Sequence, residues 1–150
     1  MPLTGPEMLR FSRRMEKFYA RQFEPLLRQT DLSMREIQVL LFLANNPACD
    51  TARDVTELRG LAKSQVSQAV ELLAARGLLQ RTPDGADRRV VHLRITEAGV
   101  PLARQAQHIQ QQWGIQLLSG LTPAEAAQFH ALLEKVRAQV ETLMEKEILE

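Results

Sequence analysis

The side chains in this sequence that are best suited to binding chemistry are hydrogen-bonding and cationic, and they gather in two short segments. The first segment combines a lysine with small hydroxyls and amides: Lys63, Ser64, Gln65, Ser67 and Gln68. Serine and glutamine both donate and accept hydrogen bonds, as base edges and phosphates require, and lysine neutralises a phosphate. The segment is therefore a candidate contact for nucleic acid, although the same residue types also form ordinary solvated helix faces.

The second segment, Asp84 to Arg89, has the composition of a protruding turn. Arg88 and Arg89 put two guanidinium groups on it, of which one can enter the narrow, negative minor groove of DNA while the other follows a phosphate. We expect Asp87 to orient a nearby arginine, because phosphates repel a carboxylate. Such a turn is often only a solvated surface feature. Its position after a predicted helix-turn-helix favours a role in DNA binding here.

A helix is predicted to carry the first segment. Between residues 62 and 76 the apolar side chains recur at helical spacing and mark one buried side: Val66, Ala69, Val70 and Leu73. Ser64, Ser67 and Gln68 repeat that spacing on another side. Gly77 is expected to end the helix, because glycine readily adopts the left-handed backbone conformation that closes helices.

Two further helices are predicted before this one. Ser33-Met-Arg-Glu36 has the capping-box pattern, in which both side chains bond to free backbone N–H groups at a helix start. Thr51-Ala-Arg-Asp54 is a second candidate cap, and Gly60 supplies a short turn into the helix of residues 62–76. Two helices joined by a tight turn predict a helix-turn-helix.

The hydrophobic period changes from helical to alternating after Gly77. Residues 78–81 and 90–95 are predicted to pair as a hairpin with Asp84 to Arg89 at its tip. A helix-turn-helix followed by a hairpin is the order of a winged helix-turn-helix, whose second helix enters the major groove of duplex DNA.

Long apolar stripes lie toward both ends of the sequence. Residues 8–26 have a near-heptad stripe that predicts one buried helical face. Thr96 is expected to cap a long helix with Pro101 near its first turn, and Thr122-Pro-Ala-Glu125 caps a last helix whose apolar residues reach Leu143. Because these stripes are long for one small core, we expect them to pair two copies of the chain; in the alternative, they fold back on their own domain.

Composition restricts the class of protein. The chain has 150 residues, a formal net charge of +1 and a single cysteine. Residues 51–96 hold eight Lys+Arg against five Asp+Glu, so the excess of positive charge lies in the predicted winged lobe. Cys49 cannot form an intramolecular disulfide and has no cationic neighbour in sequence, which favours a bystander thiol. We expect a cytoplasmic protein with no targeting or membrane-spanning segment.

No sequence motif predicts catalysis or a cofactor. The sequence lacks a P-loop, G-x-G-x-x-G, G-x-S-x-G and H-E-x-x-H. His92, His108 and His130 are scattered without carboxylate or cysteine partners, so we expect no metal site. An enzyme is therefore not expected, although catalytic residues distant in sequence would leave no such motif.

The sequence resembles the MarR (multiple antibiotic resistance regulator) family of winged-helix transcription factors. The resemblance is carried by Ala62-Lys-Ser-Gln-Val-Ser-Gln68, Glu71-Leu-Leu-Ala-Ala-Arg-Gly-Leu-Leu79, Asp84-Gly-Ala-Asp-Arg-Arg89 and Leu93-Arg-Ile-Thr-Glu-Ala-Gly99, and it is close over residues 33–102. Ala62 departs from the family pattern, because a serine or threonine often caps the recognition helix at that place.

The resemblance implies a mainly α fold with a small β-hairpin wing, a winged helix-turn-helix flanked by N- and C-terminal dimerisation helices. Residues 1–150 would form a single MarR-like domain, with 33–96 as the DNA-binding lobe and 6–28 and 97–147 as dimerisation helices. It also implies a homodimer whose two lobes grip successive major grooves of a pseudo-palindromic operator.

Many members of the family are released from DNA by a small aromatic or anionic effector. The resemblance implies a pocket between the dimerisation helices and the lobe, for which Tyr19 and Trp113 are candidate walls and Arg14 a candidate partner of an anion. The alternative interpretation is that these aromatic residues are core and the arginines are solvated.

The sequence therefore predicts a sequence-specific, duplex-DNA-binding transcriptional regulator, expected to act as a repressor. No aromatic residue lies between Phe42 and Trp113, so the lobe lacks a stacking platform for single-stranded bases. The alternative function is a winged-helix adaptor that binds protein rather than DNA. The two differ in that DNA binding weakens steeply with salt.

Overall fold

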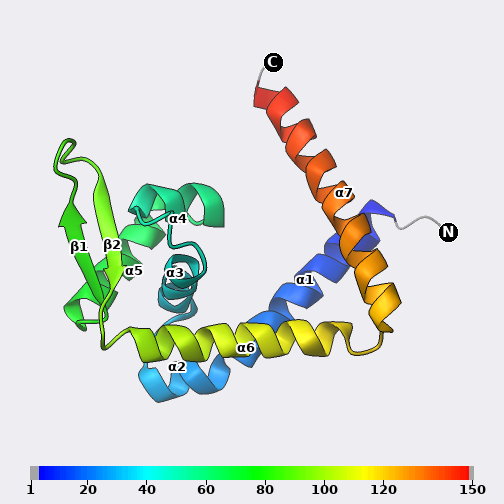
Figure 1. Ribbon diagram of the computed structural model, residues 1–150, viewed down its shortest axis with the longest axis horizontal. Helices are drawn as coiled ribbons and strands as arrows, with labels where there is room; N and C mark the ends of the chain where they lie inside the picture. Colours follow the sequence, from blue (N-terminus) through cyan, green and yellow to red (C-terminus); the bar gives the residue numbers. More distant parts are fainter. Residues whose placement is uncertain (1–3, 149–150) are drawn as a thin grey trace. The chain divides into compact units, whose positions relative to one another are not determined.

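Helices and one β-hairpin make up the computed structural model, which describes residues 4–148. The elements are α1 (Gly5–Gln22), α2 (Glu24–Thr30), α3 (Met34–Asn45), α4 (Ala52–Arg59), α5 (Lys63–Ala75), β1 (Leu79–Pro83), β2 (Val91–Ile95), α6 (Val100–Leu118) and α7 (Pro123–Ile148) (Figure 1). The chain divides into two compact units, one ending at Trp113 and one beginning at Gly114, with the boundary inside α6. The predicted mainly α fold with a small hairpin is confirmed.

Three helix starts follow the predicted local chemistry. Ser33 Oγ accepts a hydrogen bond from Glu36 N at 3.3 Å, and the Glu36 carboxylate accepts one from Ser33 N at 3.1 Å. The Thr51 and Asp54 pair forms the same reciprocal arrangement at α4. Thr122 and Glu125 form it again at α7. Each pair satisfies backbone donors that the first turn of a helix leaves free, so the sequence alone sets these boundaries.

The apolar stripe of residues 8–26 does not lie on one continuous helix. α1 ends at Gln22 and α2 begins at Glu24, with Phe23 at the junction, where its N–H bonds to Ala20 O at 3.2 Å. Pro25 accounts for the break, because its ring lacks an N–H donor and would collide with the carbonyl of the preceding turn. None of α1 is buried within one copy of the chain, whereas Phe23 and Leu26 are, so the face that the stripe predicts to be buried stays open along α1.

Glycines close α4 and α5, which together form the helix-turn-helix. Gly60 has φ +73° and ends α4, and Gly77 has φ +71° after α5. Gly77 N bonds to Ala74 O at 3.0 Å and Leu78 N to Leu73 O at 3.0 Å, which satisfies carbonyls that the helix end leaves free. The backbone then runs directly into β1.

The hairpin has the predicted antiparallel pairing. β1 and β2 pair from Leu79 opposite Ile95 to Pro83 opposite Val91, with the turn of residues 84–90 between them. Thr96 was predicted to cap the next helix directly, but α6 starts only at Val100, and a turn separates the two. In that turn Thr96 Oγ1 donates to Gly77 O at 2.6 Å and accepts from Gly99 N at 3.2 Å.

The apolar core lies where α3, α5 and the hairpin meet. Ile37 and Leu40 of α3, Val55 of α4 and Val66 and Leu73 of α5 are each at most 1% exposed. They are the positions that helical periodicity predicts to face inward. The core holds the exposed side of α5 and the base of the hairpin in fixed positions relative to each other.

The first and last helices keep their apolar residues exposed. Met8 and Phe11 of α1 are 51% and 61% exposed, and Phe129 and Leu132 of α7 are 46% and 53% exposed. Both helices have apolar residues at helical spacing that are exposed. No helix among residues 4–148 combines the length and apolar character needed to cross a bilayer.

Candidate nucleic-acid interface

The polar side of α5 spreads over a wide arc with Ser64 at its middle. Lys63, Ser64, Ser67 and Gln68 are exposed and Gln65 is half-buried. Because successive residues turn by about 100° around a helix, Lys63 and Ser67 lie to one side of Ser64, whereas Gln68 and Gln65 lie to the other. We call this arc the polar edge of α5, and a different groove flanks it on each side.

The groove on the Lys63 side lies between α4, α5 and the hairpin. Its volume is about 830 Å³, and its walls include Lys63 and Ser67 from α5, Arg53 from α4 and Arg89 from the turn. Arg53, an exposed residue that the sequence analysis missed, forms an ion pair with Glu57 at 2.7 Å. The three cations of this groove come from three separate segments, so only the fold could reveal them as one group.

The groove on the other side lies between α5 and the start of α3. It has a volume of about 380 Å³ and is lined by Gln65 and Gln68 together with Arg35. Gln65 Oε1 accepts a hydrogen bond from Ala62 N at 3.3 Å. This bond is one of the two bonds of a capping box at the start of α5. The other bond is absent, because Ala62 has no side-chain acceptor. Gln65 is therefore partly engaged, whereas Gln68 is exposed.

The turn of the hairpin holds the two predicted arginines at the surface. Arg89 Nε donates to Asp87 Oδ1 at 3.2 Å, and Arg89 N donates to the same oxygen at 3.0 Å. The side chain of Arg89 is nevertheless 93% exposed, so its remaining N–H groups stay available to a ligand. Arg88 is exposed as well. The carboxylate of Asp87 thus lies where it restricts the orientation of Arg89.

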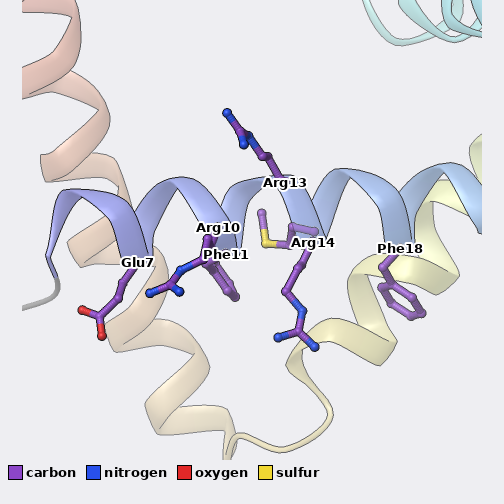
Figure 2. A pocket seen from close by; sticks show the side chains of 7 residues that line it. Glu7, Arg10, Phe11, Arg13, Arg14 and Phe18 are labelled. Carbon is purple, nitrogen blue, oxygen red and sulfur yellow. The ribbon is translucent and has the colours of Figure 1, made fainter.

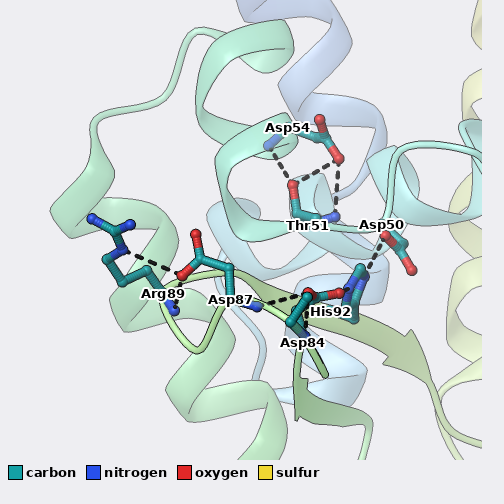
Figure 3. A network of polar contacts seen from close by, with 8 residues as sticks. Asp50, Thr51, Asp54, Asp84, Asp87, Arg89 and His92 are labelled. Carbon is teal, nitrogen blue, oxygen red and sulfur yellow. Dashed lines mark hydrogen bonds and ion pairs between the residues drawn. The ribbon is translucent and has the colours of Figure 1, made fainter.

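His92 of β2 has two carboxylate partners, so the prediction that the histidines lack such partners was wrong for this residue. Its Nδ1 lies 2.9 Å from Asp50 Oδ1 and its Nε2 lies 2.7 Å from Asp84 Oδ1 (Figure 3). The hydrogen bond to Asp84, then that to Asp50, raises the pKa of His92. The hydrogen bonds from His92 and from the backbone N–H groups of Asp87 and Ala86 lower the pKa of Asp84 to about 2.

Tyr19 and Trp113 meet at a cavity of about 580 Å³. Their ring centroids are 5.0 Å apart in an edge-to-face arrangement, and Tyr19 Oη accepts a hydrogen bond from Gln110 Nε2 at 3.0 Å. Burial raises the pKa of the Tyr19 phenol, while the Gln110 bond and the charge of Arg59 oppose that rise. Trp113 Nε1 is buried without a hydrogen-bond partner among residues 4–148, and Arg59 of α4 lines the same cavity.

Arg14 lies on a different surface from this cavity. It lines a shallow hollow formed by α1 alone, together with Arg10 and Phe11 (Figure 2). In Figure 2 Arg10 and Arg14 extend to one side of α1 and Arg13 to the other. Of the three candidate effector residues, Tyr19 and Trp113 are therefore brought together and Arg14 is not. Arg59 is the cation that sequence reasoning missed, because 40 positions separate it from Tyr19.

Comparisons with known proteins agree with this geometry. A family model described as MarR family matches residues 30–90. The HTH-type transcriptional repressor IacR of Pseudomonas putida is 29% identical over 126 residues, which cover 83% of this chain and 74% of the repressor. Over residues 30–90 the chain is therefore similar to the MarR family.

Solved structures share the fold of this chain. BpsR of Bordetella bronchiseptica, whose regulation of DNA binding by 6-hydroxynicotinic acid was studied structurally, has 26% identity and a TM-score of 0.70 over 87% of this chain and 98% of BpsR. MepR of S. aureus, solved in complex with DNA, has 21% identity and a TM-score of 0.73 over 87% of this chain and 95% of MepR. At 21% identity, the similarity to MepR concerns the fold alone.

Proposed function

We propose that this chain binds duplex DNA and regulates transcription, acting as a repressor. The observation that carries the proposal is the combination of an exposed polar edge on α5 with a cationic groove that joins this edge to Arg89. The names of the repressor IacR and of MepR in complex with DNA support it. The proposal includes no catalytic step.

In this account α5 enters the major groove, which is about 12 Å wide and admits one helix. Ser64 and Gln68 meet base edges, because both are exposed on the outward arc of the helix. Lys63, Arg53 and Arg89 neutralise phosphates from the groove that they line. Arg88, also exposed on the turn, extends the contact toward the minor groove.

The exposed faces of α1 and α7 support a homodimer as the working form. Their apolar residues need a cover, and a second copy of the chain supplies one with the same two faces. The charges of the helices are complementary: α1 has five Lys+Arg against two Glu, and α7 has three against five. Two lobes related by a twofold axis would read a pseudo-palindromic operator, with half-sites about one helical turn apart.

The cavity beside Tyr19 supports release by a small aromatic anion. Its edge-to-face ring pair offers an apolar wall, and Arg59 is a cation at the end of α4, the first helix of the helix-turn-helix. A carboxylate bound there would act on α4 directly. BpsR, regulated by 6-hydroxynicotinic acid, is a relative with a ligand of this chemistry.

The test is selection of bound fragments from random genomic DNA by the purified chain, followed by titration of the selected duplex at increasing salt. We expect affinity to fall steeply with salt, with a slope of roughly one per neutralised phosphate. Arg89→Ala should reduce that slope by about one per copy of the chain and weaken selected and random duplex alike.

Arg104→Ala, which removes an exposed arginine from α6, is the matched control and should behave as wild type. The absence of duplex binding at every salt concentration would contradict the proposal and favour the protein-binding adaptor. Binding that survives Arg89→Ala unchanged would remove the hairpin from the interface. Addition of phenolic or nicotinic acids to the wild-type complex then tests release.

A further inference from the structure

The imidazole of His92 bridges the body of the lobe and the turn of the hairpin. Asp50, its partner on Nδ1, lies in the loop between α3 and α4, and Asp84, its partner on Nε2, begins the turn after β1 (Figure 3). The same loop meets β2 a second time, because Leu93 N donates to Asp50 O at 2.7 Å. The ring is therefore held at both nitrogens by groups that belong to different parts of the fold.

This arrangement requires a doubly protonated ring. An ionised carboxylate can only accept hydrogen bonds, and a neutral imidazole has one N–H and one lone pair. In the neutral form, one of the two nitrogens would direct its lone pair at a carboxylate oxygen less than 3.0 Å away, at 2.9 Å for Asp50 or 2.7 Å for Asp84. Only the imidazolium donates to both carboxylates at once, so loss of its proton must open one of the two contacts.

Asp84 transmits this contact to the arginine of the turn. Its second carboxylate oxygen accepts hydrogen bonds from the backbone N–H groups of Ala86 and Asp87, each at 3.0 Å. Asp87 in turn accepts from Arg89 through the backbone and the guanidinium. An unbroken sequence of hydrogen bonds thus leads from Asp50 through the ring to the proposed phosphate ligand.

The other charged groups near this face of the hairpin are engaged elsewhere. On β2, Arg94 lies two residues from His92 on the same face and donates to Gln80 of β1 at 2.5 Å. Arg81 of β1 pairs with Leu93 and so faces the other side. On α4, Asp54 accepts from Thr51, and α3 carries its charges in its first turn, where Glu36 accepts from Ser33. Asp50 and Asp84 are therefore the groups that govern the ring.

We propose that His92 is a positioning residue for the wing: in its imidazolium form it fixes Asp84 and thereby the turn that presents Arg89 to DNA. The effect on DNA binding rests on the proposed function. The hydrogen-bonded link from His92 through Asp84 to the turn exists in the free protein and does not depend on that function. His92 contacts no DNA in this account, and it acts through Asp84 and Asp87.

The sign of the pH dependence follows from the raised pKa of His92. The hydrogen bonds of His92 to Asp50 and Asp84 stabilise the turn fully below the ordinary histidine pKa of about 6.5. This stabilisation is lost as the pH rises through the higher pKa that His92 has in the folded protein. Asp84, with a pKa of about 2, stays ionised over that range. A turn that is ordered at pH 6 should therefore loosen toward pH 9, and DNA binding should weaken with it.

The first experiment uses the free, full-length chain and follows amide hydrogen exchange and the ring nitrogens of His92 by NMR from pH 6 to pH 9. We expect both ring nitrogens to carry protons at pH 6 and the protection factors of the Ala86 and Asp87 amides to fall as His92 titrates. In His92→Gln these two amides should be weakly protected at every pH. The Leu93 amide, bonded to Asp50 O, should stay protected in both proteins and reports that the lobe is folded.

The second experiment measures the Kd for a selected duplex over the same pH range at constant salt. The wild-type Kd should rise by about tenfold from pH 6 to pH 9. The slope of log Kd against pH should approach one proton for each wing. His92→Gln should change by less than about threefold and start from the weaker value. His108→Gln, which alters an exposed histidine of α6, is the matched control and should follow wild type.

The two experiments separate the two proposals. A ring with a single proton at pH 6, or amides at residues 86 and 87 that keep full protection in His92→Gln, would overturn the positioning role whatever the DNA result. A wild-type chain that binds no duplex at any pH would overturn the proposed function, while the exchange data would still decide the link between His92 and the turn.

Discussion

The winged lobe and the terminal helices use the same sequence pattern with opposite results. In α3 and α5 the apolar residues at helical spacing are buried by other parts of the same chain, and the polar side is exposed. In α1 and α7 an equally regular apolar side remains open, with Phe11 61% and Leu133 49% exposed. Periodicity therefore identifies which side of a helix is apolar, but not whether this chain or another copy covers it.

The first prediction tests this contrast at the open surface and carries the largest expected effect. Leu133→Asp puts a carboxylate into the proposed interface of each copy, at a cost of roughly 2 kcal/mol or more apiece, so dimer dissociation should become about 10³-fold easier. Sedimentation equilibrium measures it. Ala138→Asp adds the same charge on the opposite side of α7 and should leave the dimer intact. A Leu133→Asp chain that sediments as wild type would mean that another surface pairs the copies.

The second prediction tests the contrast inside the lobe, on two neighbouring leucines. Leu73 of α5 is 0% exposed and Leu72 is 46% exposed. Leu73→Ala should lower the free energy of unfolding by about 2–5 kcal/mol, because it removes buried contacts and leaves a cavity. Leu72→Ala should cost less than about 1 kcal/mol. Urea denaturation at one fixed protein concentration compares them, and equal costs would contradict the assigned inward side of α5.

The third prediction concerns the exposed side of the same helix. Gln68→Ala should reduce discrimination at one or two base positions by about 1–3 kcal/mol, because a bidentate amide contact to a base edge is lost. Its affinity for random duplex should hardly change. Competition binding with single-base variants of the selected duplex measures this, with Gln29→Ala on α2 as the control. Uniform weakening on every sequence would instead assign Gln68 to the phosphate backbone.

The smallest expected effect sharpens the account of how α5 begins. Ala62 has the extended backbone of a helix cap, φ −65° and ψ 144°, but no side-chain acceptor. Ala62→Ser should therefore raise the free energy of unfolding by roughly 0.5–1 kcal/mol through a bond to a free N–H of the first turn. Urea denaturation detects it. Ala75→Ser at the other end of α5 should give no such gain, and a destabilised Ala62→Ser chain would contradict the local geometry.

Features that depend on neighbouring residues could be predicted from the sequence. The caps at Ser33, Thr51 and Thr122 need partners only three positions away, and the alternation of residues 90–95 fixes the face of each strand residue. The break between α1 and α2 was predictable in principle, since Pro25 marks it, but the apolar stripe continues across it and conceals it.

Features that depend on distant residues could not be predicted. Asp50 and His92 are 42 positions apart, and no pattern in either segment indicates that they meet. The same holds for Arg53, Lys63 and Arg89, three cations of one groove that come from three elements. Sequence spacing reports side-chain direction within an element, whereas these groups are joined by the packing of α4 and the hairpin against α3 and α5.

The most direct test of the division between lobe and terminal helices is hydrogen–deuterium exchange of the full chain with and without a selected duplex. We predict that DNA slows amide exchange in residues 63–68 and in the turn of residues 84–90. Exchange along α7, which we propose pairs the copies in both states, should stay unchanged. A duplex that binds tightly while protecting neither segment of the lobe would contradict the assignment of α5 and the wing as the DNA-binding surface.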